Sequence, residues 1–233
     1  VAGAGWATVL AQVVSAIAAF VFMLIKYPVL RVKARHFKTD WRWCWRHLVI
    51  GLPMGFQYSI TGIGVIVQQS VLNMLGTPAV TATTAANKLD ALATQSLLAI
   101  GSTMATYCGQ NYGAGAYKRI RQGVNAGLIL SLLFGAVGSL FVIVCAKPLT
   151  LFLVPDADAE ILRLSQVFLN WQGAFYSALA VLFVYRNALQ GMSRSGLTVI
   201  AGVVELGMRI LAAFVLARFL GFTGASMSNP IAW

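Results

Sequence analysis

The feature that most constrains this chain is a stretch of 40 residues, 48–87, without a single charged side chain. About 20 apolar residues cross the hydrocarbon core of a bilayer as one helix, so the stretch is too long for one span. Gly76, Thr77 and Pro78 interrupt it. Because proline lacks a backbone donor and glycine tolerates tight turns, we predict two helices joined by a turn at this point.

The rest of the chain repeats this character. Residues 6–25 and 122–146 also lack charge, and further helices are predicted from about 159 to 190 and from 197 to about 220. The chain is 59% hydrophobic and 10% charged, and its mean hydropathy of +0.78 lies outside the range of a soluble domain. The sequence therefore predicts an all-α, polytopic transmembrane helix bundle with about six membrane helices.

The charged residues indicate an orientation. A net charge of +11 could indicate a nucleic-acid surface, but the basic residues cluster in short loops between apolar segments. Residues 26–46, residues 118–121 and Arg194 fall in three loops on one predicted side, which we assign to the cytoplasm because cytoplasmic loops are enriched in Lys and Arg. Tryptophans interleaved with arginines at 41–46 predict an interfacial anchor on that leaflet.

The helix predicted to start at Leu48 carries a polar stripe. Gln57, Thr61, Gly64 and Gln68 are spaced by four, three and four residues, so they share one face. At membrane depth such a stripe faces protein or water rather than lipid. Two interpretations stay open: Gln57, Thr61 and Gln68 line a substrate cavity, or the stripe packs between helices.

The following helix, from 79 to about 107, contains two charges, Lys88 and Asp90. They are two positions apart, so they point in different directions and do not form a local pair. A carboxylate within a membrane is costly when ionised, which makes Asp90 a candidate proton or sodium site. Asn87, Lys88 and Gln95 are candidates for the substrate cavity. Alternatively, both charged side chains reach headgroups or water by snorkelling.

Four residues nearer the C-terminus complete the set of candidates. Glu205 and Arg209 are four apart with the acid first, which favours an intrahelical ion pair of structural importance. Glu205 is kept as a second ion-coupling candidate. Gln172 and Tyr176 are candidates for a substrate-contacting wall, because flat organic cations stack on aromatic rings. Tyr176 would equally suit the aromatic belt at a membrane interface.

No pattern of residues indicates an enzyme. His36 and His47 lie in a basic loop without a carboxylate or cysteine at ligand spacing, and the three cysteines lie far apart. The glycines of 109–115 do not follow a predicted strand, so they do not indicate a phosphate-binding loop. We therefore predict no catalytic residue, no metal site and no cofactor.

Three motifs connect the chain with a known family. Gly-Gln-Asn-Tyr-Gly-Ala-Gly at 109–115 precedes a basic cluster, and Arg-Asn-Ala-Leu-Gln-Gly-Met-Ser-Arg-Ser-Gly at 186–196 and Glu-Leu-Gly-Met-Arg at 205–209 follow in order. With these motifs the chain resembles the multidrug and toxic compound extrusion (MATE) transporters. The resemblance covers nearly the whole chain, but only the second half of a family member.

The resemblance implies a domain organisation for the chain. Residues 1–25 would be the last transmembrane helix of an N-terminal lobe, and 26–47 a basic cytoplasmic linker between lobes. Residues 48–221 would be five transmembrane helices of the C-terminal lobe, and 222–233 the truncated start of a final helix. The chain is thus expected to form one half of a two-lobed transporter in the cell (inner or plasma) membrane, packed against the N-terminal lobe of the same protein.

The resemblance also implies a function: efflux of organic, often cationic, compounds in exchange for protons or sodium by alternating access. Small organic substrates and membrane lipids would be the partners, without nucleic acid. The carboxylates that many members carry in this half are replaced by Thr61 and Leu179, which weakens the expectation of that type of cation coupling. The alternatives are a lipid-linked saccharide flippase of a related superfamily, which needs a more cationic cavity, and a membrane-embedded lipid-modifying enzyme, which needs clustered nucleophiles.

Overall fold

The computed structural model describes residues 2–28, 31 and 40–233, and within these ranges it contains helices and no strand. Contacts divide the chain into two units, Val1–His47 and Leu48–Trp233, which we describe separately. The predicted linker at 26–47 lies partly outside the described residues. That the first unit contains the end of another lobe stays a prediction.

The first unit contains α1 (Ala2–Lys26) and the first turns of α2 (Trp41–Met74). Residues Gly5–Lys26 of α1 are long and apolar enough to cross a membrane. α2 begins at Trp41 rather than at the predicted Leu48. The Oδ1 atom of Asp40 accepts a hydrogen bond of 3.0 Å from the backbone N–H of Arg42, and such a cap stabilises a helix start within the basic segment.

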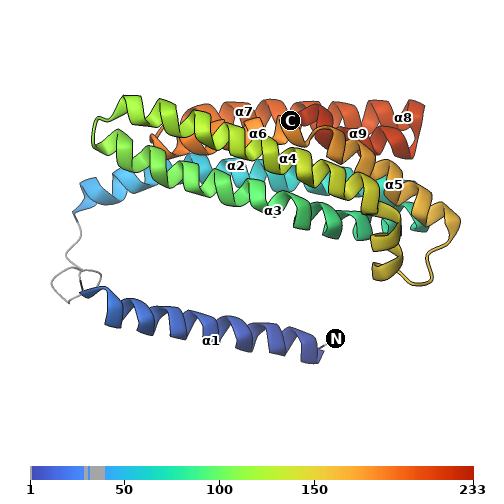
Figure 1. The fold of residues 1–233 in the computed structure, drawn as a ribbon, viewed down its shortest axis with the longest axis horizontal. Helices are drawn as coiled ribbons and strands as arrows, with labels where there is room; N and C mark the ends of the chain where they lie inside the picture. Colours follow the sequence, from blue (N-terminus) through green and yellow to red (C-terminus); the bar gives the residue numbers. More distant parts are fainter. Residues whose placement is uncertain (1, 29–30, 32–39) are drawn as a thin grey trace. The chain divides into compact units, whose positions relative to one another are not determined.

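The second unit begins with three long helices, namely the rest of α2, α3 (Thr77–Gly113) and α4 (Tyr117–Leu153). The predicted turn between α2 and α3 is present, with Gly76 at φ 96° and Pro78 in the first turn of α3. Gly115, at φ 68°, lies in the turn between α3 and α4. These two helices run side by side (Figure 1), as a helical hairpin.

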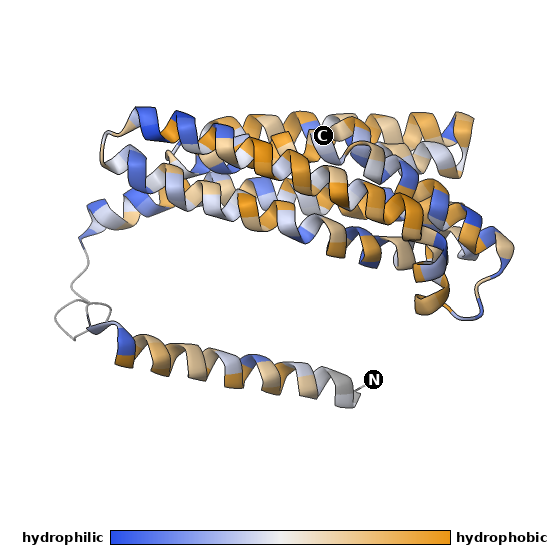
Figure 2. Cartoon of the chain, viewed as in Figure 1, coloured by the Kyte–Doolittle hydropathy of each residue, from blue (hydrophilic) through white to orange (hydrophobic). Residues whose placement is uncertain are grey.

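The remaining helices pack against this hairpin and α2. They are α5 (Ala159–Ala174), α6 (Tyr176–Gly191) and α7 (Ser195–Leu211), which continues through a π-helical segment (Ala212–Leu216) into α8 (Ala217–Leu220), followed by α9 (Phe222–Ala232). The largest buried cluster combines Leu97, Val142, Phe168 and Tyr176 from α3, α4, α5 and α6. Apolar residues predominate along the helices, and many hydrophilic residues lie near the helix ends (Figure 2); many large apolar side chains of the unit are exposed, as expected of a bundle embedded in a bilayer.

α3 continues to Gly113 rather than ending at about residue 107, and two larger differences from the prediction follow. α4 does not end at Lys147 but continues through Pro148 to Leu153, and it turns sharply near that end (Figure 1). Two contacts from α5 hold this part of α4: Gln166 Nε2 donates to the carbonyl of Ile143 at 2.9 Å, and the hydroxyls of Thr150 and Ser165 lie 2.7 Å apart. These contacts lie on both sides of Pro148, and packing against a neighbouring helix in this way helps a membrane helix to accommodate a proline.

The second difference is a break in the helix predicted from about 159 to 190. It is divided at Phe175 into α5 and α6, which are bent by 50° relative to each other. Four described helices are individually long and apolar enough to span a membrane, and the bent pair makes a fifth candidate. α3 is also long enough to span a membrane, but its polar residues make it less apolar than these candidate spans. The assignment of α3 as the sixth predicted span is therefore supported by its packing against α4 and not by its hydropathy.

Candidate functional site

A row of polar side chains on α3 is exposed in the second unit. Asn87, Lys88 and Gln95 are all exposed, whereas Ala86 and Leu89, on the other side of the helix, are buried. Within the part of the chain that the structure describes, none of the three polar side chains forms a hydrogen bond or ion pair. We call Asn87, Lys88 and Gln95 the α3 polar face. Its position in a substrate cavity stays a prediction.

Asp90 lies one turn from this face and has a specific partner. The Tyr176 hydroxyl donates to Asp90 Oδ1 at 2.7 Å. Tyr176 is fully buried at the first residue of α6, where its ring approaches Gly138 of α4. The ring therefore lies between α3, which it meets at Asp90, and α4, which it meets at Gly138. The structure thus brings together an ion-coupling candidate and a cavity candidate.

Gln172 lies one turn before Tyr176, in α5, and only 1% of its surface is exposed. Neither its Nε2 nor its Oε1 atom has a hydrogen-bond partner among the described residues. A buried amide without partners is costly. The residue lies inside the unit rather than on a wall open to solvent, so contact between Gln172 and a substrate would require rearrangement of α5.

The polar stripe of α2 packs against α6 and α7. Gln57 is buried, and its Oε1 accepts a hydrogen bond of 2.8 Å from Gln190 Nε2. A Cβ at Gly202 would lie 3.3 Å from the Gln57 side chain, so this glycine lets α7 approach α2 closely. The hydroxyl of Thr61 donates to the carbonyl of Gln57 in its own helix, and Gln68 is buried. These contacts favour the packing interpretation of the stripe.

The predicted ion pair between Glu205 and Arg209 is present and contains a third member. Arg209 Nη2 lies 2.7 Å from Glu205 Oε1, and Arg186 Nη2 lies 2.5 Å from Glu205 Oε2. The three side chains are 6 to 11% exposed. Arg209 crosses α2 at Gly64, where a Cβ would meet its side chain at 2.9 Å. Because arginines engage both carboxylate oxygens, the contacts favour a structural role for Glu205 over ion coupling.

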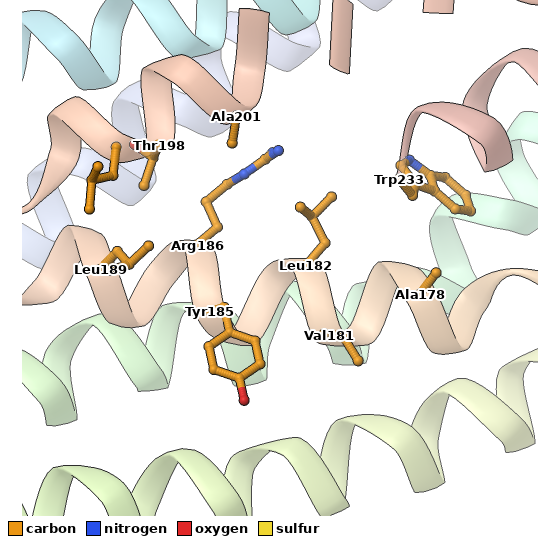
Figure 3. Close-up of a pocket in the computed structure, with 10 residues that line it drawn as sticks. Ala178, Val181, Leu182, Tyr185, Arg186, Leu189, Thr198, Ala201 and Trp233 are labelled. Carbon is orange, nitrogen blue, oxygen red and sulfur yellow. The ribbon is translucent and has the colours of Figure 1, made fainter. Parts of the chain in front are cut away.

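Arg186 also lines a hollow of about 430 Å³ between α6 and α7. Leu182 and Arg186 point from α6 toward α7, Thr198 and Ala201 border the hollow from α7, and Trp233 lies at its other end (Figure 3). The walls are mainly apolar. The Nε atom of Arg186 is buried without a hydrogen-bond partner in the described part of the chain.

Sequence reasoning missed two residues that contact the predicted polar side chains. Arg186 binds Glu205, and Gln190 binds Gln57. Both residues lie within the motif at 186–196, but neither was predicted to form a contact with another helix. A signal was present in the sequence: the two residues are four apart and therefore share one face of α6. This face meets Gln57 and Glu205, which are themselves polar residues on apolar helices.

The described residues contain no group of three or more His, Cys, Asp or Glu side chains that could hold a metal ion. The three cysteines are free. Two titratable groups of the unit have specific partners: Asp90 is bound by Tyr176, and Glu205 by two arginines. Such an arrangement can bind and release a small ion or proton, or hold helices together.

Comparison with known proteins identifies a family and several relatives that this chain resembles. The MatE family model matches residues 53–215. The probable multidrug resistance protein YpnP of Bacillus subtilis (strain 168) is 27% identical over 190 residues, which are 82% of this chain and 42% of that protein. The chain thus spans less than half of this relative.

Solved structures show the same fold. The crystal structure of a MATE protein in complex with MaL6 gives a TM-score of 0.84 at 17% identity, covering 99% of this chain and 52% of that one. The Vibrio cholerae MATE transporter VcmN in its bent form gives 0.81 at 18% identity, covering 93% and 50%. These relatives are named as transporters or resistance proteins and not as enzymes. The chain is therefore a membrane protein that belongs to the MatE family of transporters.

Proposed function

We propose that the complete protein exports organic, often cationic, compounds across the cell membrane in exchange for protons or sodium ions. The observation that carries this proposal is the α3 polar face, in which Asn87, Lys88 and Gln95 are exposed and unpaired within the described residues. Polar side chains at membrane depth face water or protein rather than lipid. A water-filled cavity bordered by α3 satisfies this requirement and offers hydrogen bonds to a substrate.

Asp90 supplies the ion-responsive group of the proposed mechanism. Its Oδ1 atom is held by the Tyr176 hydroxyl, while the carboxylate as a whole is half-buried beside the α3 polar face. Binding of a proton or sodium ion would neutralise the carboxylate and weaken its preference for a hydrated environment. Because Tyr176 is the first residue of α6, the change would be transmitted to the helix break at Phe175. Alternating access then requires that substrate and ion favour different arrangements of the lobes.

A second candidate, the transport of lipid-linked saccharides, is favoured by one observation. Lys88 is an exposed cation without an ion-pair partner in the described ranges. A lone ammonium group in a cavity would attract a pyrophosphate and repel an organic cation. Asp90, on another face of the same helix, supplies the ion-responsive carboxylate that an antiporter needs, so we place organic-compound export first.

The test uses the complete protein in proteoliposomes and follows a fluorescent organic cation while proton and sodium gradients are imposed in turn. We expect movement under one gradient, and we expect Asp90→Asn to abolish its dependence on that gradient. Asp156→Asn, in an exposed loop, is the matched control. Unchanged ion dependence in Asp90→Asn would remove Asp90 from the mechanism. Absence of movement under both gradients, with folded protein, would favour the lipid-linked substrate.

A further inference from the structure

The first turns of α2 present arginines and tryptophans around one hollow. Trp41, Arg42, Trp45 and Arg46 line a depression of about 490 Å³ in the first unit. On a helix, positions i, i+1, i+4 and i+5 form one continuous patch, because residues four apart are neighbours on the surface. The two guanidinium groups therefore lie on one side of the patch and the two indoles on the other.

The positive charge of this patch is not compensated within the described residues. No ion pair engages Arg42 or Arg46 there, since the ion pairs found all involve Glu205. The nearby carboxylate of Asp40 instead caps the helix by accepting from the backbone N–H of Arg42. The guanidinium of Arg46 lies over the ring of Trp43, 5.3 Å from its centroid. This cation–π contact restrains Arg46 while leaving its N–H groups available.

The indoles of the patch are unusually open. Trp41 is 70% exposed and Trp45 is 57% exposed. Large aromatic surfaces in water are unfavourable, and tryptophan is enriched at the level of lipid headgroups, where one end of the ring is apolar and the other is wet. The patch directly precedes the 40-residue uncharged stretch, 48–87. This sequence position places it at a membrane surface.

We propose that Arg42 and Arg46 bind the phosphate of an anionic phospholipid headgroup, while Trp41 and Trp45 contact the glycerol and upper acyl region of the same lipid. Arginine forks match phosphate oxygens in a bidentate manner. The patch thus has charge complementarity for an anionic lipid and an apolar surface for its hydrocarbon. A free phosphate ion would use the arginines but leave the indoles exposed, which is why a lipid is the better occupant.

The test is a titration of the complete, detergent-solubilised protein with phosphatidylglycerol and with phosphatidylcholine. Native mass spectrometry counts the lipid molecules bound to each protein. Each basic residue near a membrane surface changes anionic-lipid binding by about fivefold, so we expect Arg42→Ala with Arg46→Ala to lower the affinity for phosphatidylglycerol roughly 25-fold. Binding of phosphatidylcholine should change little. Arg42→Lys with Arg46→Lys should retain part of the preference, because the charge remains and the fork is lost.

The control removes two charges elsewhere: Lys118→Ala with Arg121→Ala, at the start of α4. An equal loss in this control, or unchanged phosphatidylglycerol binding in the alanine pair at 42 and 46, would overturn the proposal. A further arm adds glycerol phosphate at millimolar concentration. Complete displacement of the lipid by this soluble headgroup would show that the site takes free phosphate esters and would also overturn it. Loss of affinity in Trp41→Ala with Trp45→Ala would support the lipid contact, and an unchanged affinity would contradict it.

Discussion

At the scale of single residues, the hydrogen bond from Tyr176 to Asp90 joins two residues that are 86 positions apart in the sequence and lie on different helices, α6 and α3. It gives a carboxylate within the bundle a donor, and it holds the first residue of α6 against α3. The bond therefore contributes to stability whatever the coupling ion is. Its strength can be measured separately from transport.

We expect Tyr176→Phe to destabilise the complete protein by about 1–3 kcal/mol, because the half-buried Asp90 carboxylate loses its donor. The measurement is thermal unfolding in detergent, for Tyr176→Phe, Asp90→Ala and the double variant, because alanine removes the acceptor that asparagine would keep. The cycle should give an interaction energy between about 0.5 and 3 kcal/mol. Tyr185→Phe, at a ring that is 49% exposed, should leave the unfolding midpoint unchanged. Additive effects at positions 90 and 176 would show that the bond contributes nothing.

The polar residues differ in how far sequence could place them. The pair of Glu205 and Arg209 was predictable, because both partners lie on one helix at a spacing that geometry fixes. Gln57 and Gln190 are 133 positions apart, and no local rule specifies which amide meets which. Arg186 illustrates the same limit, since its partner Glu205 is on another helix. Sequence thus identified most members of the site and the pairing within one helix, but not the pairings between helices.

At the scale of helices, α3 and α6 approach closely through small residues. A Cβ placed on Gly191 would collide with the backbone carbonyl of Ala105, and one on Gly109 would lie 3.1 Å from the carbonyl of Gly191. Membrane helices lack a hydrophobic force between them, so close backbone contact at small residues is a main source of association. Gly109, inside α3, and Gly191, the last residue of α6, thus both have a packing role.

Gly191→Ala should therefore separate α3 from α6 and destabilise the protein by about 1–3 kcal/mol, the range found for overpacked interiors. Gly207→Ala is the matched control, because a Cβ at Gly207 meets nothing within 4 Å. Thermal unfolding and the yield of monodisperse protein both report the effect. Equal midpoints for the two variants would show that the backbones adjust without loss.

Helix ends were predictable where glycine or proline determines them locally, as at Gly76 and Gly115, which adopt positive φ. The break at Phe175 was not, because it depends on burial of Tyr176 among α3 and α4 rather than on a strong breaker. At Pro148 the local signal was overridden, since contacts from α5 stabilise the last turns of α4. Local chemistry thus determined the turns, and tertiary packing determined the breaks.

At the scale of the whole molecule, the charge pattern predicts that the turn between α3 and α4 faces the cytoplasm and the loop before α5 faces outward. Lys118→Cys and Ala157→Cys, each in a variant without Cys44, Cys108 and Cys145, test this orientation. In intact cells a membrane-impermeant maleimide should label the second variant and not the first. Opening the cells should expose the first. Labelling of both variants from one side would contradict the topology.

The length of the hairpin has a mechanical consequence. α3 contains 37 residues, which rise about 55 Å, whereas the hydrocarbon core of a bilayer is about 30 Å thick. The part of α3 that exceeds the hydrocarbon thickness would place the turn at 114–116 beyond the headgroups, at the end of a rigid helical hairpin. A rotation of the unit by roughly 10° about its far end would sweep that tip through about 10 Å. A spectroscopic reporter at the tip would then record the motion at greater amplitude than one inside the bundle.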